Sequence, residues 1–167
     1  MKNLRFIFPL LLGLMLMTLS TSTQAQTYNS AIGLRLGFPL SASYKTFINE
    51  NGAIELYAGV RGYSTYSWVN ISGAYQVHKP IEGAEGLQWY FGGGASVYFW
   101  NFKDVFGPST GFANTTLGIQ GYLGLDYAIP NTPINLTADW VPTYFFNGFG
   151  SGFGGGFGSL GVRYILN

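Results

Sequence analysis

Acidic and basic side chains recur at alternate positions of segments that are otherwise apolar. The acids are Glu55, Asp126 and Asp139, and the bases are Arg35, Lys45, Arg61 and Arg163. Carboxylates brought together in this way could act as a general acid and base or hold a metal ion. Buried charges are costly unless opposite signs pair, and here the acids and bases nearly cancel. We therefore predict a salt-bridge network that fills the interior of the fold.

A second chemistry would use the single histidine, His78, as the base for Ser72. A base must lie within hydrogen-bond reach of its nucleophile, but six positions along one strand separate these residues by roughly 20 Å. We therefore expect His78 to be a solvated residue of a turn beside Lys79 and Pro80. The chain has no cysteine, which leaves no strong transition-metal site. We predict no catalytic residue, cofactor or metal.

Strands must position these charges, because apolar and polar residues alternate along the segments that carry them. Side chains of a strand point alternately to its two faces, so each segment has an apolar face and a face that tolerates charge. Residues 53–61 and 116–129 show the pattern. In the second segment the apolar face holds Leu117, Ile119, Leu123, Leu125, Tyr127 and Ile129, opposite Gln120 and Asp126. This alternation is typical of a transmembrane barrel that is apolar toward lipid and polar inside.

Eight segments are predicted as strands, and most reach the roughly 9–11 residues that a tilted strand needs to cross a bilayer. They cover approximately residues 29–38, 41–48, 53–63, 67–78, 87–100, 116–129, 134–145 and 158–166. With aliphatic residues outward, all seven charges named above point inward, and the remaining charges fall in turns or loops. Pro142 should cause a bulge or break. The sequence predicts an all-β, closed antiparallel eight-stranded transmembrane barrel; a soluble ligand-binding barrel with exchanged faces is the alternative.

Composition and the first residues agree with an exported membrane barrel. The chain is 47% hydrophobic but only 9% charged, whereas soluble domains average about 25% charged residues. Its 8 basic and 7 acidic residues nearly balance, so there is no basic patch for nucleic acid. Lys2 and Arg5, an apolar stretch over residues 6–19 and small residues up to Ala25 predict a cleaved signal peptide over residues 1–25. The barrel would then occupy residues 26–167.

The connections predict the orientation of the barrel. Residues 49–52 and 130–133 are compact turns, whereas residues 101–115 and 146–157 form the longest loops. Short periplasmic turns and long external loops are usual, so both termini should face the periplasm.

An open pore is not expected, because eight strands leave room only for side chains. Several inward aromatic residues would crowd the lumen: Tyr57, Tyr63, Trp68, Tyr90, Tyr98, Trp100 and Tyr122. A narrow barrel that binds or conducts a small hydrophobic ligand is the alternative to a structural role. A lipid-modifying enzyme is the third.

The most unusual local sequence, residues 146–157, combines glycine with four phenylalanines: Phe146, Phe149, Phe153 and Phe157. Glycine suits a flexible external loop. Phenylalanines in solvent are unfavourable without a partner, which indicates a surface contact element. Residues 152–157 could instead extend the last strand pair.

The chain resembles the small eight-stranded outer-membrane barrels of the opacity/OmpX-like type, and in particular the functionally unassigned outer-membrane beta-barrel domain proteins. Residues 33–38, 43–45, 51–55 and 161–164 carry this resemblance, which extends over residues 26–167. It implies the outer membrane of a Gram-negative bacterium, contact with outer-membrane lipid and lipopolysaccharide, and insertion by the barrel assembly machinery. Such proteins commonly end on an aromatic residue, whereas this chain ends on Asn167. The implied role is structural or one of surface interaction.

Overall fold

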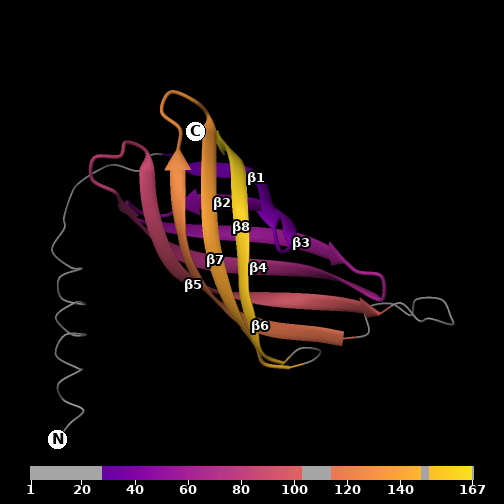
Figure 1. The fold of residues 1–167 in the computed structure, drawn as a ribbon. Helices are drawn as coiled ribbons and strands as arrows, with labels where there is room; N and C mark the ends of the chain where they lie inside the picture. The colour runs from indigo at the N-terminus through magenta and orange to yellow at the C-terminus, as the bar shows by residue number, and fades with distance from the viewer. Residues whose placement is uncertain (1–27, 103–113, 148–150, 167) are drawn as a thin grey trace, which may run out of the picture.

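Eight antiparallel strands succeed one another along the chain and around a closed barrel (Figure 1). The computed structural model describes residues 28–102, 114–147 and 151–166. The strands are β1 (Ser30–Gly37), β2 (Leu40–Phe47), β3 (Gly52–Gly62), β4 (Tyr66–Pro80), β5 (Leu87–Phe102), β6 (Asn114–Ala128), β7 (Ile134–Phe145) and β8 (Gly152–Leu166). Each strand pairs with the next, and β8 pairs with β1 to close the wall. The predicted signal peptide lies outside the described residues and stays a prediction.

The predicted fold class, an all-β closed barrel of eight antiparallel strands, is confirmed. The largest difference lies in β8, which begins at Gly152 rather than near residue 158. Residues 152–157 pair with β7, with Phe153 opposite Tyr144 and Phe157 opposite Val141. Glycine is a weak strand former, but the backbone hydrogen bonds of an adjacent strand outweigh that preference here. The described part of the chain contains no helix long and apolar enough to cross a membrane.

The two faces of the wall separate by residue type as the alternation predicted. Large apolar side chains cover the outside, where Ile32, Leu34 and Leu36 of β1 are each about half exposed. Arg35, between them, is 3% exposed and points inward. One charge departs from the prediction: Lys79 belongs to β4 rather than to a turn, and it lies opposite Trp89 on the outward face.

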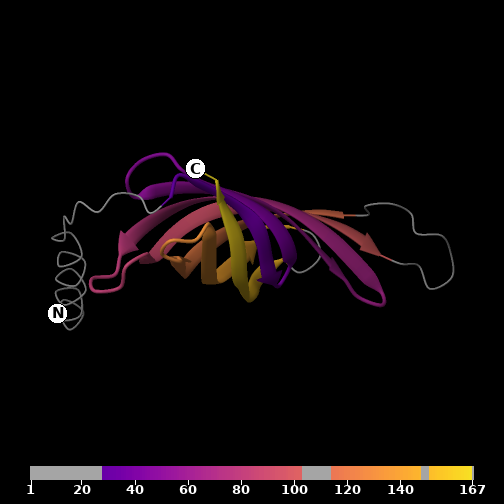
Figure 2. The ribbon, with the colours of Figure 1, turned by 90° about the horizontal axis from the view of Figure 1, so that it is seen from above.

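The connections divide the barrel into two ends. The "turn end" carries the connections over residues 48–51, 81–86 and 129–133, and the "loop end" carries those over residues 38–39, 63–65, 103–113 and 146–151. Strands β1 and β2 have 8 residues each, whereas β4 and β5 have 15 and 16. The wall formed by β3–β6 therefore projects farther at the loop end than the hairpin of β1 and β2 (Figure 2).

The expected irregularity at Pro142 is present. The pairing of β7 with β8 shifts register between Pro142 and Tyr144. Proline has no N–H to donate to the ladder, so a break in regular pairing follows from its chemistry.

Candidate functional site

Glu55 is the centre of an ion-paired network in the half of the lumen nearer the turn end. Its carboxylate accepts hydrogen bonds from Arg35 Nη1 at 2.9 Å, from Gln76 Nε2 at 2.7 Å and from Arg163 Nη2. The other guanidinium nitrogen of Arg35 lies 2.9 Å from a carboxylate oxygen of Asp139. The side chains of Glu55, Arg35 and Arg163 are buried. Buried charges in this arrangement satisfy one another by hydrogen bonds as well as by opposite sign.

A second ion pair crosses the lumen from one wall to the opposite wall. Lys45 Nζ on β2 donates to Asp126 on β6 at 3.1 Å. Strands β2 and β6 are four apart in a closed barrel of eight, so this contact spans its diameter. Asp126 also accepts from Tyr28 Oη at 2.9 Å and from Asn135 Nδ2 at 2.5 Å. The network therefore ties the turn end of the barrel together from side to side.

Tyrosine side chains fill the lumen next to the ion-paired network, toward the middle of the barrel. The hydroxyls of Tyr57 on β3 and Tyr122 on β6 lie 2.9 Å apart, and Tyr90 donates to Asp139 at 2.6 Å. The guanidinium of Arg35 stacks 4.6 Å from the centroid of the Tyr57 ring. A neighbouring small cavity measures about 10 Å³, close to the minimum that holds one water molecule. Contacts across the lumen at two levels thus oppose an open channel.

Arg61 lies apart from the other six charges of the predicted set. It is near the loop end of β3, where its guanidinium lies 4.5 Å from the ring centroid of Phe38 and 5.4 Å from that of Tyr63. Its buried Nε has no hydrogen-bond partner, and no ion pair joins it to an acid of the described residues. The alternation of side chains correctly predicts that Arg61 points inward. However, Arg61 lies too far along β3 from Glu55 to join the network.

Aromatic side chains fill the loop-end half of the lumen. We call Phe38, Tyr66, Trp68, Tyr98, Trp100, Phe102, Phe145 and Phe157 the "mouth cluster". Ring centroids are 5.1 Å apart in the stacked pair of Phe38 and Phe157 and in the edge-on pair of Trp68 and Tyr98. Trp100 Nε1 donates to Thr116 Oγ1 at 2.9 Å. Rings in offset or edge-on contact attract one another beyond the area that they bury.

The four phenylalanines proposed as one contact loop do not stay together. Phe146 and Phe153 are exposed, at 60% and 68%. Phe157 belongs to β8, points inward and packs in the mouth cluster, so its assignment to an external loop is wrong. Phe149 lies outside the described residues. The error arises because the last strand was predicted to begin near residue 158. Phe157 was therefore not recognised as a strand residue whose side chain points inward.

His78 is not the solvated turn residue that the sequence suggested. Strand β4 continues to Pro80, so His78 points inward and is 1% exposed. Its ring stacks on Tyr90 at 4.9 Å and meets Phe47 at 4.8 Å. Ser72 is also buried, but it accepts a hydrogen bond from Asn70 and lies well along the strand from His78. The structure does not bring these two residues together as a nucleophile and its base.

Tyr63 is a smaller correction. It lies just beyond the end of β3 and is 37% exposed, so it borders the mouth of the barrel instead of filling the lumen.

A closed eight-stranded wall, an apolar exterior and a lumen crossed by ion pairs define the class of small outer-membrane β-barrels. Comparison with solved structures gives the same fold. The chain is similar to Neisserial surface protein A (NspA), with a TM-score of 0.64 and 19% identity over 82% of this chain and 93% of that one. The N-terminal β-barrel domain of Pseudomonas aeruginosa OprF gives a TM-score of 0.63 and 17% identity, over 84% of this chain and 100% of the domain.

A third similar structure is Ail, the attachment invasion locus protein of Yersinia pestis, with a TM-score of 0.51 and 16% identity over 82% of this chain and 93% of Ail. No protein-family model and no curated protein matches the sequence. Identities this low show a common fold. The predicted resemblance to small outer-membrane barrels is confirmed at that level, and the apolar exterior fits the predicted location in the outer membrane.

Proposed function

We propose that the protein is a structural barrel of the outer membrane that presents its loop end at the cell surface as a contact element. The observation that carries this proposal is the contrast along the lumen. Ion pairs tie the turn end together, while aromatic rings gather at the loop end both inside and outside the wall. A rigid base with an adaptable, ring-rich mouth suits surface contact.

Outward rings at the loop end lie where the outer leaflet would meet the barrel. Tyr144, Phe146 and Phe153 are 48%, 60% and 68% exposed. Tyr144 pairs with Phe153 across β7 and β8, and its ring meets that of Phe146 edge-on at 5.7 Å. Aromatic side chains concentrate at membrane interfaces, as in the girdles of outer-membrane barrels. In the proposed orientation these three rings contact the lipopolysaccharide leaflet.

In the part of the chain that the structure describes, the mouth offers rings and one positive charge. Tyr63 is partly exposed beside Arg61, and Arg61 has no acidic partner among the described residues. An arginine stacked on aromatic rings keeps its hydrogen-bond donors for another group. The mouth therefore suits an external partner that presents acidic groups.

The other two functions receive less support from this geometry. Conduction of a hydrophobic ligand needs a path through the lumen, and the Lys45–Asp126 pair crosses it. A lipid-modifying enzyme of the serine–histidine kind needs contact between those residues, and Ser72 and His78 lie about 20 Å apart along β4.

The orientation can be tested with single cysteines, since the chain has none of its own. Ser64 is exposed at the loop end and Glu82 is exposed at the turn end. A membrane-impermeant maleimide should label Ser64→Cys on intact cells and should label Glu82→Cys only after lysis. Labelling of Glu82→Cys alone on intact cells would contradict the proposal.

The lipopolysaccharide contact can be tested on the purified barrel. The double variant Phe146→Ser, Phe153→Ser should retain several-fold less lipopolysaccharide per barrel than the unmodified protein, because it removes two exposed rings. Phe91→Ser is the matched control, since Phe91 is an exposed outward ring in the half nearer the turn end. Equal lipopolysaccharide content in all three proteins would exclude the proposed contact.

A further inference from the structure

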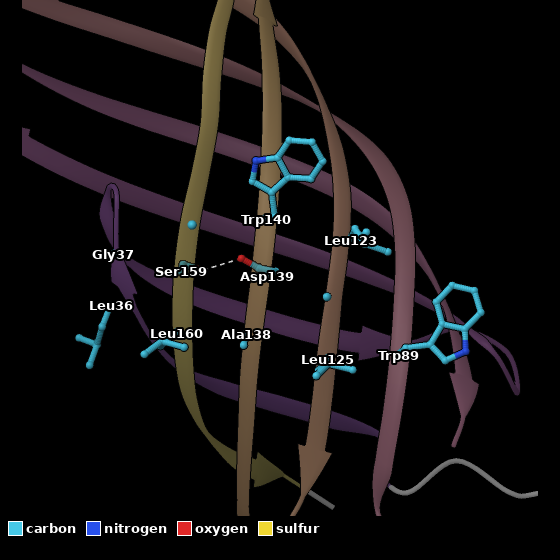
Figure 3. Close-up of a pocket in the computed structure, with 12 residues that line it drawn as sticks. Leu36, Gly37, Trp89, Leu123, Leu125, Ala138, Asp139, Trp140, Ser159 and Leu160 are labelled. Carbon is cyan, nitrogen blue, oxygen red and sulfur yellow. Dashed lines mark hydrogen bonds between the residues drawn. The ribbon is translucent and has the colours of Figure 1, made fainter. Parts of the chain in front are cut away.

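A groove of about 710 Å³ crosses the outer surface over β5, β6, β7, β8 and β1 (Figure 3). Trp89 on β5 and Trp140 on β7 stand beside it, with Leu123 and Leu125 of β6 between them. Its floor is low because two outward positions that line it carry small residues, whereas neighbouring outward positions carry large ones. The two small residues are Ala138 and Gly158.

The groove rises obliquely from the turn end. Five outward residues follow one row of directly paired positions: Trp89, Leu125, Ala138, Leu160 and Leu36. Trp89 is the third residue of β5 from the turn end, whereas Leu36 is the seventh residue of β1. Four strand spacings of about 4.8 Å give the row a length of roughly 19 Å. One leaflet of a bilayer has a hydrocarbon depth of roughly 15 Å, so one acyl chain matches this row.

The interior acid beneath the groove does not place a charge in it. Asp139 contributes to the floor, but its carboxylate faces the lumen. There it accepts hydrogen bonds from Arg35, Tyr90 and Ser159, the last at 2.7 Å. The surface open to the membrane is thus an apolar slot.

One cation stands at the low end of this slot. Lys79 is the only charged side chain on the outward face of the described strands, at the position paired with Trp89. Its ammonium lies 5.8 Å from the centroid of the Trp89 ring. A lysine on the lipid face is costly at the membrane midplane and is tolerated near the interface. At the interface it attracts anionic lipid headgroups.

We propose that this groove binds one anionic glycerophospholipid of the periplasmic leaflet, with an acyl chain along the row from Trp89 to Leu36 and its phosphate beside Lys79. The inference rests on the orientation given under the proposed function, with the turn end at the periplasm. Lipopolysaccharide would enter from the opposite leaflet and place its phosphates away from Lys79. A second copy of the chain would use the apolar slot without needing the lysine.

The test is native mass spectrometry of the full barrel in detergent, with phosphatidylglycerol or phosphatidylcholine of identical acyl chains added. The barrel should retain one phosphatidylglycerol about fivefold more than phosphatidylcholine, since one lysine at a membrane surface contributes about that factor in affinity. Lys79→Gln should remove the preference for phosphatidylglycerol, and Lys79→Arg should keep it. Equal retention of both lipids by the unmodified barrel would overturn the proposal.

Filling the groove provides an independent test. Ala138→Phe should reduce retention of both lipids several-fold, because the new ring occupies the floor. Ala58→Phe is the matched control, because Ala58 is an exposed outward alanine of β3, away from the groove. Undiminished retention by Ala138→Phe would overturn the proposal, as would a dimer that this variant abolishes or a preference for added lipopolysaccharide over phosphatidylglycerol.

Failure of the proposed function would look different. Labelling of cysteines from the wrong side would reject the orientation and hence the assigned leaflet, whatever the lipid preference measured in detergent. Normal labelling with no lipid preference would reject the lipid site and leave the surface role standing.

Discussion

The two ends of the lumen are filled by different kinds of interaction. At the turn end, each buried charge has a partner of opposite sign, and the contacts reach across the barrel. At the loop end, rings pack against rings, and Arg61, the one cation there among the described residues, lies over Phe38 with no acidic partner among them. Ion pairs in a dry interior tolerate little change in geometry, because a displaced partner leaves a bare charge. Aromatic packing depends less on direction and can adjust around a contact.

Two arginines show this difference within one residue type. Arg163 is 1% exposed and donates to Glu55, to Ser43 at 3.1 Å and to Thr137 at 3.2 Å. Arg61 is only half-buried and makes ring contacts. The first arginine is part of the structure that closes the turn end. The second arginine, Arg61, can contact an external group at the mouth.

Loss of the buried arginine should have the largest effect. Arg163→Met removes a guanidinium that holds Glu55, so the free energy of unfolding should fall by about 3–5 kcal/mol. Reversible urea unfolding in detergent micelles measures it, with Glu50→Gln in the exposed turn as a control that should change little. A loss below about 1 kcal/mol would mean that the network does not secure the turn end.

The ion pair across the diameter should show strong coupling. Lys45→Met and Asp126→Asn should each destabilise the barrel, and the double variant should lose about 1–3 kcal/mol less than the sum of the two. The physical reason is that the second substitution removes a charge already left unpaired by the first. Additive losses would show that the 3.1 Å contact contributes no pairwise stability.

A hydrogen bond within the mouth cluster should have a smaller effect. Trp100→Phe keeps most of the ring but removes the donor to Thr116, so about 1 kcal/mol of stability should be lost. Thr116→Val should lose a similar amount, and combining the two should cost little more. A loss comparable with that of Arg163→Met would remove the distinction between the two ends.

Arg61→Met should change stability least, by less than about 1 kcal/mol, because Arg61 is only half-buried and its cation–π contacts contribute on that scale. The same urea unfolding series measures it beside Arg163→Met. If the two arginine variants lose equal stability, Arg61 contributes to folding as much as Arg163 does. The loop end would then be no more adaptable than the turn end.

The alternation of apolar and charged residues was enough to predict the barrel and the faces of its strands. A period of two fixes the face of each side chain once one residue is placed, so Arg35 and Asp139 could be set inside from the neighbouring leucines and tryptophan. Pairing partners were harder to predict. That Lys45 would meet Asp126 depends on strand stagger across the lumen, which one segment does not encode.

Strand ends were the weak point. His78 was assigned to a turn because Lys79 and Pro80 follow it, although pairing with β5 carries β4 through both. Phe157 was assigned to a loop because glycines surround it, although pairing with β7 begins at Gly152. In both cases the partner strand supplies hydrogen bonds that outweigh local preference. The sequence does not predict the outer groove for a related reason, since Ala138 and Gly158 come from different strands and align only in the folded wall.

The most direct test of a closed barrel in the membrane is the electrophoretic mobility of protein extracted from purified outer membranes. A closed barrel resists detergent at room temperature, so unboiled protein should migrate faster than boiled protein, and it should be found in the membrane fraction. A soluble periplasmic protein without this shift would contradict the membrane assignment, and the apolar exterior would then have to be covered by something other than lipid.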